Sequence, residues 1–191
     1  RILLFKNDKN LGDYPNRNRA AKLANGKYLK YVDSDDLINT ECLEKLVEPL
    51  QKNPEAAYSL TYPRPENTIR PLLLTPGEAY KCHFVDRQGI FSSGPLLAMI
   101  RTDRFREVGG FRDQARNMGD TILWLELSSR WSMILVEEGL CWWRQHEGQE
   151  YELVRTINKE NAITHSKLTA LLLTEFLVAP GCPLLPSDRK R

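Results

Sequence analysis

The sequence predicts an α/β fold in which a mostly parallel sheet is flanked by helices. Strand-like apolar runs alternate with segments of helical spacing through residues 1–62, in the order strand, helix, strand, helix, strand. That alternation is typical of strands joined by helical crossovers. The chain has 191 residues, of which 41% are hydrophobic, and this is enough for one domain with a real core.

The elements of the first half follow from apolar spacing and from turn residues. We expect strands at residues 2–5, 28–32 and 56–62, and helices at 16–24 and 41–52. Asn25-Gly26 ends the first helix and Pro54 follows the second. The second helix carries its apolar residues at helical spacing: Leu43, Leu46, Val47 and Leu50.

The second half begins with a proline-rich stretch at 63–88, which we interpret as a long irregular excursion over the sheet. Strands are expected at 96–101, 133–136 and 140–143, a helical turn at 103–108, and a helix at "GDTILWLELSSR". Residues 152–177 predict one long helix or two, and the tail "PGCPLLPSDRKR" is expected to fray. We therefore predict a main domain over residues 1–150 and a helical extension over 151–191.

Composition and charge exclude several classes of protein. A net charge of +2 gives no electrostatic basis for a nucleic-acid partner. The widely spaced cysteines Cys42, Cys82, Cys141 and Cys182 form no CxxC pair, so no zinc ribbon or dithiol redox motif is predicted. We expect reduced thiols in a cytoplasmic protein.

The C-terminal region could meet a membrane only at its surface. No apolar run reaches the length of about 18 residues that a spanning helix needs. Leu168, Leu171, Leu172 and Phe176 form an apolar stripe. Such a stripe either packs on the core, which we favour, or gives peripheral contact with the inner face of a membrane or with a partner. Separately, an oligomer of the chain is left open.

The stretch "KYLKYVDSDDLIN" places three carboxylates, Asp33, Asp35 and Asp36, directly after an apolar strand. Like charges this close raise one another's pKa unless a cation lies between them. Ligands of open parallel sheets bind at such strand ends, and Mg²⁺ or Mn²⁺ takes one or two carboxylates plus substrate phosphates. The alternative is an exposed turn that caps the next helix.

A longer segment around this stretch resembles family 2 glycosyltransferases of the GT-A fold. The segment "NLGDYPNRNRAAKLANGKYLKYVDSDD" aligns without gaps with the family pattern. That pattern is N-x-G-x-x-x-A-R-N-x-G, followed by an A-x-G-x-Y turn, an apolar strand and D-S-D-D. Asn16 stands at the position of a usual small residue and Ala20 at that of a usual glycine. "VGGF", "GDTILWLEL" and "WRQHEGQ" then follow in the family's order.

The resemblance implies a GT-A-like fold and transfer of a sugar from a nucleotide-diphosphate sugar to a hydroxyl, with inversion and a metal. The acceptor would be a glycan, a lipid-linked sugar or a protein, as in bacterial polysaccharide biosynthesis. Asp35 is the implied metal ligand, Asp33 contacts the metal or the ribose, and Asp36 supports the loop. Mn²⁺ or Mg²⁺ would offset the charge of the leaving diphosphate.

Asp120 is the implied general base, because the family has an acidic residue at this helix start. We expect it to be ionised at neutral pH, since a helix N-terminus favours a negative charge. Its alternative role is a helix cap or first-turn acid. Trp124, one turn further along, either lines the acceptor or packs, and packing is favoured.

Further donor contacts follow from the same resemblance. Arg17 and Asn18 match the family's R-N pair, and Arg144 could reach a phosphate. His146 is either a further metal ligand or diphosphate contact, or a hydrogen-bonded structural residue. Gly94 either lets the backbone approach the donor sugar closely or simply forms a turn.

The resemblance also implies an N-terminally incomplete domain, because the family's base-binding strands and loop have no counterpart before Arg1. The identity of the base and the sugar is therefore left open. Two alternatives remain: a non-catalytic transferase-like binding domain or inactive fragment, and a nucleotidyltransferase. The second would need a glycine-rich phosphate loop, which we do not find.

Overall fold

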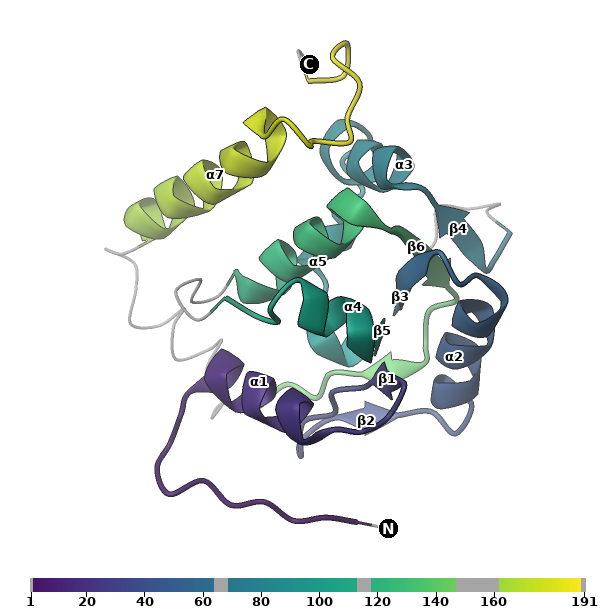
Figure 1. The fold of residues 1–191 in the computed structure, drawn as a ribbon, viewed down its shortest axis with the longest axis vertical. Coiled ribbons are helices and arrows are strands. Elements are labelled where there is room, and N and C mark those ends of the chain that lie inside the picture. The colour runs from purple at the N-terminus through teal and green to yellow at the C-terminus, as the bar shows by residue number, and fades with distance from the viewer. Residues whose placement is uncertain (1, 64–68, 113–117, 147–161, 190–191) are drawn as a thin grey trace.

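The computed structural model describes residues 2–63, 69–112, 118–146 and 162–189 of the chain. A five-stranded sheet in the order β1-β5-β3-β6-β4 lies at its centre, with helices on both faces (Figure 1). The strands of this sheet are β1 (Tyr28–Leu29), β3 (Ala56–Thr61), β4 (Leu72–Leu74), β5 (Ala98–Arg101) and β6 (Ser132–Val136). The α/β class with flanking helices is confirmed.

Strand directions in this sheet are mixed. β3 and β6 run parallel, as expected for the class. β1 and β3 each pair antiparallel with β5, and β4 pairs antiparallel with β6. Among the described strands, parallel pairing is therefore confined to the two central strands.

Two hydrophobic clusters lie on opposite faces of the sheet. Helix α2 (Cys42–Lys52) covers one face, where Leu46 and Leu50 are fully buried against Ile134. On the other face lie α1 (Asp13–Leu23), α3 (Pro76–Tyr80), α4 (Thr102–Glu107) and α5 (Gly119–Arg130). Met133 and Leu135 of β6 point to this second face, as the period-two alternation of a strand requires.

The proline-rich stretch after β3 is more ordered than the sequence suggested. Its described part contains β4, α3 and a π-helical turn at Lys81–Val85, so the expectation of an irregular excursion over 63–88 is wrong. Pro76 begins α3 rather than interrupting a helix, because the first helical position needs no N–H. Thr75 and Glu78 complete a capping box at this helix start.

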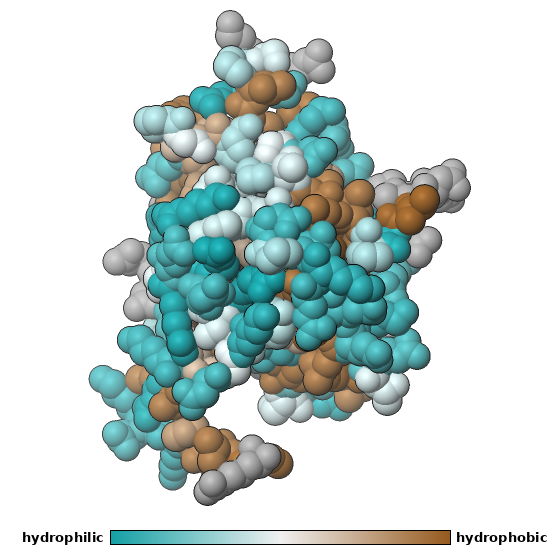
Figure 2. All heavy atoms as spheres, turned by 45° about the vertical axis from the view of Figure 1, so that its right-hand side comes forward, coloured by the Kyte–Doolittle hydropathy of each residue, from teal (hydrophilic) through white to brown (hydrophobic). Residues whose placement is uncertain are grey.

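The N-terminal segment does not form the expected strand. Residues 2–5 have no strand assignment, and Ile2 and Leu4 are 96% and 93% exposed. The arm stands away from the body (Figure 1), with its apolar atoms open to solvent (Figure 2). A strand needs a neighbour to satisfy its backbone, and the described residues provide none here.

The C-terminal region packs on the core. In α7 (Ala162–Val178), Leu173, Phe176 and Leu177 pack against the cluster that contains α5, while Leu171 is exposed. The tail is not frayed in its described part, because Cys182 and Leu184 are buried in the same cluster. The rest of the helix expected at 152–177 lies outside the described residues, and no described helix is long and apolar enough to cross a membrane.

Candidate active site

A short ribbon holds the acidic loop against the segment after Trp142. β2 (Leu37–Ile38) pairs antiparallel with β7 (Cys141–Trp142), so the chain just before β2 faces the chain just after β7. The backbone N–H of Asp36 donates to the carbonyl of Asp33 at 3.0 Å, which closes the loop as a turn. Residues more than a hundred positions apart thereby become neighbours.

Two contacts join these neighbours. Nε2 of His146 lies 2.8 Å from Oδ2 of Asp35. The backbone N–H of Arg144 donates to Oδ1 of Asp36 at 3.3 Å. Burial and the neighbouring carboxylates raise the pKa of Asp36, whereas the Arg144 contact lowers it. Of the predicted donor-site residues, Asp35 and His146 are therefore brought into direct contact.

Arg17 holds the other side of the loop. Its guanidinium pairs with both oxygens of Asp33, at 3.1 and 2.8 Å, and with Oδ1 of Asp13 at 2.6 Å. Burial opposes its charge, but the contacts with Asp33 and Asp13 prevail, so the pKa of Arg17 lies above its ordinary value. Asp13 was missed in the sequence, although its spacing of four residues from Arg17 on a helix is a recognisable signal.

Asp120 opens α5 against the first helix. Tyr14 of α1 is buried and stacks on Phe111, with ring centroids 5.2 Å apart. A Cβ atom at Gly119 would lie 2.5 Å from Cζ of Tyr14, so only glycine permits this approach. Oδ1 of Asp120 is buried and has no hydrogen-bond partner among the described residues.

Burial raises the pKa of Asp120 to about 7, while the charge of Arg17 opposes that rise. A carboxyl with a pKa of about 7 is ionised only in part at neutral pH, so the expected ionisation of Asp120 is incomplete. Desolvation disfavours the charged form more than the charge of Arg17 and the helix end favour it. A group with a pKa near the working pH is well suited to accept a proton.

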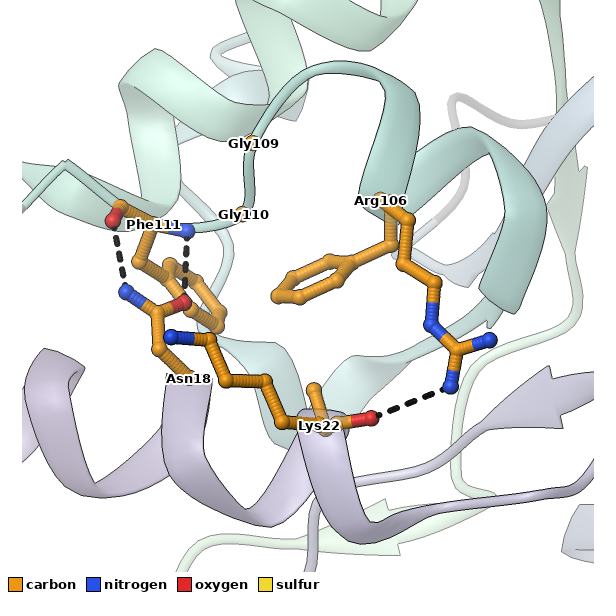
Figure 3. Close-up of a pocket in the computed structure, with 8 residues that line it drawn as sticks. Asn18, Lys22, Arg106, Gly109, Gly110 and Phe111 are labelled. Carbon is orange, nitrogen blue, oxygen red and sulfur yellow. Dashed lines mark hydrogen bonds between the residues drawn. The ribbon is translucent and has the colours of Figure 1, made fainter.

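Asn18 faces a different part of the molecule. Its side-chain amide donates to the carbonyl of Phe111 at 2.8 Å, and its Oδ1 accepts from the N–H of Phe111 at 2.9 Å. It forms one wall of a pocket of about 390 Å³ between α1 and α4, where Lys22 and Arg106 extend from the two helices (Figure 3). These two bonds fasten α1 to the turn at Gly109-Gly110.

Gly94 and Trp124 lie on the α5 side of the sheet. Gly94 has an ordinary φ of −73°, and a Cβ there would meet no atom within 4 Å. Open space above this backbone is compatible with a close ligand, but among the described residues no hydrogen bond joins Gly94 to the acidic loop. Trp124 is fully buried, stacks on Tyr58 and donates to the carbonyl of Ser93 at 2.6 Å, so the expectation that it packs is confirmed.

The donor set around the loop is compatible with a divalent cation. Asp35 supplies a carboxylate, which suits Mg²⁺ and Mn²⁺, and His146 supplies an imidazole nitrogen beside it. Within the described ranges, no group of three or more His, Cys, Asp or Glu residues could hold a metal. An ion held by Asp35 and His146 would therefore have few protein ligands and would fill its other positions with phosphate and water.

The chain thus combines an α/β sheet with a loop of carboxylates between β1 and β2 and a further acid at the start of α5, the arrangement that the resemblance to glycosyltransferases implied. The model of Glycosyl transferase family 2 matches residues 1–109. The chain belongs to this family.

Two curated relatives are uncharacterized glycosyltransferases. That of Haemophilus influenzae is 23% identical over 175 residues, which cover 86% of this chain and 58% of the relative. That of Methanocaldococcus jannaschii is 40% identical over 53 residues, or 28% of this chain and 18% of the relative. The chain thus spans less than two thirds of either protein.

Solved structures share the fold at low identity. TarS of S. aureus in complex with UDP-GlcNAc has a TM-score of 0.62 at 17% identity, over 93% of this chain and 50% of that one. Glucosyl-3-phosphoglycerate synthase from Mycobacterium tuberculosis, in complex with phosphoglyceric acid, has a TM-score of 0.52 at 13% identity, over 91% and 56%. These likenesses establish the fold.

Proposed function

We propose that this chain carries the catalytic half of an inverting, metal-dependent glycosyltransferase that moves a sugar from a nucleotide-diphosphate sugar to an acceptor hydroxyl. The observation that carries the proposal is the pairing of Asp35 with His146, beside the Arg17–Asp33 pair, in the loop between β1 and β2. TarS, which has the same fold, is known in complex with UDP and with UDP-GlcNAc, and this supports a nucleotide-sugar donor.

The site residues divide into a donor side and an acceptor side. Asp35 and His146 would hold Mn²⁺ or Mg²⁺, which would neutralise charge on the leaving diphosphate. Arg17 keeps Asp33 in place and provides positive charge at the same edge. Asp33 is then available to a ribose hydroxyl or the metal, and Arg144 extends from the segment next to the loop.

On the acceptor side, Asp120 would take the proton of the attacking hydroxyl. A pKa of about 7 keeps part of the carboxylate ionised at neutral pH, so that it can accept that proton. In an inverting displacement the base stands on the face away from the leaving group. Asp120 comes from α5, outside the acidic loop, as that geometry requires.

Calorimetric titration of Mn²⁺ with UDP, GDP and TDP tests the donor side. In Asp35→Asn, the affinity for the nucleotide in the presence of Mn²⁺ should fall by about 10–100-fold or more. Mutation of a residue that only supports a metal ligand already lowers metal affinity by that factor. Asp36→Asn is the matched control, since it removes the same charge from the same loop and keeps an acceptor for Arg144. Unchanged Mn²⁺ and nucleotide affinity in Asp35→Asn would contradict the proposal.

A further inference from the structure

Two cysteines from distant parts of the sequence meet beside the ribbon of β2 and β7. Cys42 is the first residue of α2, and Cys141 is the first residue of β7. Their Sγ atoms lie 3.5 Å apart, although the residues are 99 positions apart in the chain. In the ribbon, Cys141 pairs with Ile38, and α2 begins a few residues after Ile38. The pairing of the two short strands therefore brings the two thiols together.

A cation lies next to this pair of thiols. Nζ of Lys30 donates to Sγ of Cys141 at 3.5 Å and also to the carbonyl of Leu96. The same carbonyl accepts the S–H of Cys141 at 3.2 Å. An ammonium group beside a sulfur atom favours the negatively charged thiolate, which is the form of cysteine that attacks an oxidant.

We propose that Cys141 and Cys42 form an oxidation site that takes hydrogen peroxide and closes to an intramolecular disulfide, with Lys30 as the positioning residue for the attacking sulfur. Cys42 is fully buried, whereas Cys141 is partly exposed, so the oxidant meets Cys141 first. Burial and the contact with Cys141 raise the pKa of Cys42 to about 11, against the charge of Lys30, so Cys42 remains a thiol until its partner has reacted. This site is independent of the proposed sugar transfer.

The reaction consumes one peroxide for each pair of thiols. The Cys141 thiolate attacks one oxygen of the peroxide, the O–O bond breaks, and the hydroxide that leaves is protonated to water, which gives a sulfenic acid. Sγ of Cys42 then attacks the sulfenic sulfur, the S–O bond breaks, and the departing hydroxide takes the proton of Cys42 to form a second water. The thiol pair loses two electrons, and the peroxide gains them.

Peroxide treatment of the wild-type chain tests the site without any variant. After the remaining thiols are blocked with iodoacetamide, intact mass and peptide mapping should show the loss of two hydrogen atoms and a peptide linked through Cys42 and Cys141. Dithiothreitol should reverse both changes. A linkage through Cys82 or Cys182, a linkage between two chains, or a Cys141 that stops at sulfenic or sulfinic acid would overturn the inference.

Two serine variants sharpen this measurement. Cys141→Ser should abolish the linked peptide, because it removes the attacking sulfur. Cys82→Ser is the matched control and should keep the linked peptide, since Cys82 packs against the cluster on the opposite face of the sheet. Linkage of Cys42 to another cysteine in Cys141→Ser, at the wild-type rate, would contradict the assigned partner.

The rate of linkage tests the part of Lys30. Lys30→Gln should slow the reaction by about 3-fold, because less thiolate remains while that thiolate is a somewhat stronger nucleophile. Lys30→Arg keeps the charge and should keep most of the rate. Lys27→Gln removes the same charge from an exposed side chain nearby and should leave the rate unchanged. Equal rates in Lys30→Gln and Lys27→Gln would overturn the role given to Lys30.

Closing the bond ties the start of α2 to β7. Because the bond joins residues 99 positions apart, the urea midpoint of the oxidised chain should lie about 1–2 M above that of the reduced chain. Peroxide-treated Cys141→Ser should show no such rise. An oxidised wild-type chain that unfolds at the same or a lower urea concentration would mean that the native packing does not accommodate the bond, and this would overturn the inference.

Discussion

The carboxylates of the candidate site occupy two opposite environments. Those of the acidic loop lie in solvent or close to it, and each is held by a contact from another segment: Asp33 by Arg17, Asp35 by His146 and Asp36 by Arg144. Asp120 lies in the first turn of α5, next to α1. One of its carboxylate oxygens is completely buried and has no hydrogen-bond partner among the described residues.

The difference shows how one chain can give the same chemical group two tasks. The loop carboxylates lie in or near solvent and are paired with Arg17, His146 and a backbone N–H, which suits the proposed contact with a metal ion and a diphosphate. Burial makes the charge on Asp120 costly, which brings its pKa to about 7 and suits a group that gains and loses a proton. Environment, rather than residue type, separates the two roles.

The largest expected effect tests the role of the buried carboxylate. In the full-length protein, Asp120→Asn should lower sugar transfer by about 10²–10⁴-fold, as is typical of losing a general base. Donor and metal binding should remain nearly intact, because the asparagine does not alter the acidic loop. Transfer rates and calorimetric donor titrations on the same sample check both parts. A variant that transfers at the normal rate, or that loses nucleotide binding instead, would put the base elsewhere.

A second prediction concerns the free energy of unfolding. The folded-state pKa of Asp120 is raised from 3.8 to about 7, so the neutral form favours the folded state. Its stabilising contribution is complete below about pH 4 and is lost as pH rises through about 7. The loss amounts to up to about 4 kcal/mol at 1.36 kcal/mol per pKa unit.

Urea unfolding between pH 4 and pH 8 measures this dependence. Asp120→Asn should remove most of it, because an amide does not titrate. Asp103→Asn changes an exposed aspartate in the first turn of α4 and should leave the pH dependence as it is in the wild type. Equal pH dependence in wild type and Asp120→Asn would mean that Asp120 is not desolvated in the folded chain.

The exposed region was the easier one to predict from sequence. The sequence shows a recognisable pattern of acidic residues after an apolar run, followed later by the "WRQH" segment. The structure also places α2, β3 and α5 within a few residues of their expected positions. Apolar periodicity and turn residues determine such elements locally. The acidic loop and the "WRQH" segment are brought together by the pairing of β2 with β7. Each of these strands has two residues, which is too short to give a periodic signal in the sequence.

The buried region could not be predicted in the same way. The contact of Tyr14 with Gly119 joins residues 105 positions apart, and nothing local in "GDYPN" indicates it. The pKa of Asp120 depends on desolvation, which only the folded packing determines. The predicted strand at residues 2–5 is absent for a related reason. Its apolar composition is that of a strand, but a strand forms only where a neighbouring strand can pair with it.

The smallest expected effect compares a glycine at the buried contact with a glycine whose Cβ atom would meet open space. Gly119→Ala would place a methyl group 2.5 Å from the buried Tyr14 ring, which Phe111 prevents from moving away. Overpacking of this kind costs about 1–3 kcal/mol, against a gain of about 1 kcal/mol from helix propensity. Gly94→Ala is the matched change, because its φ is −73° and its Cβ would meet no atom within 4 Å. Its unfolding free energy should therefore stay within about 0.5 kcal/mol of the wild type. Thermal and urea unfolding of the two variants measure the difference, and a Gly119→Ala chain as stable as Gly94→Ala would mean that α1 and α5 are not in close contact at this point.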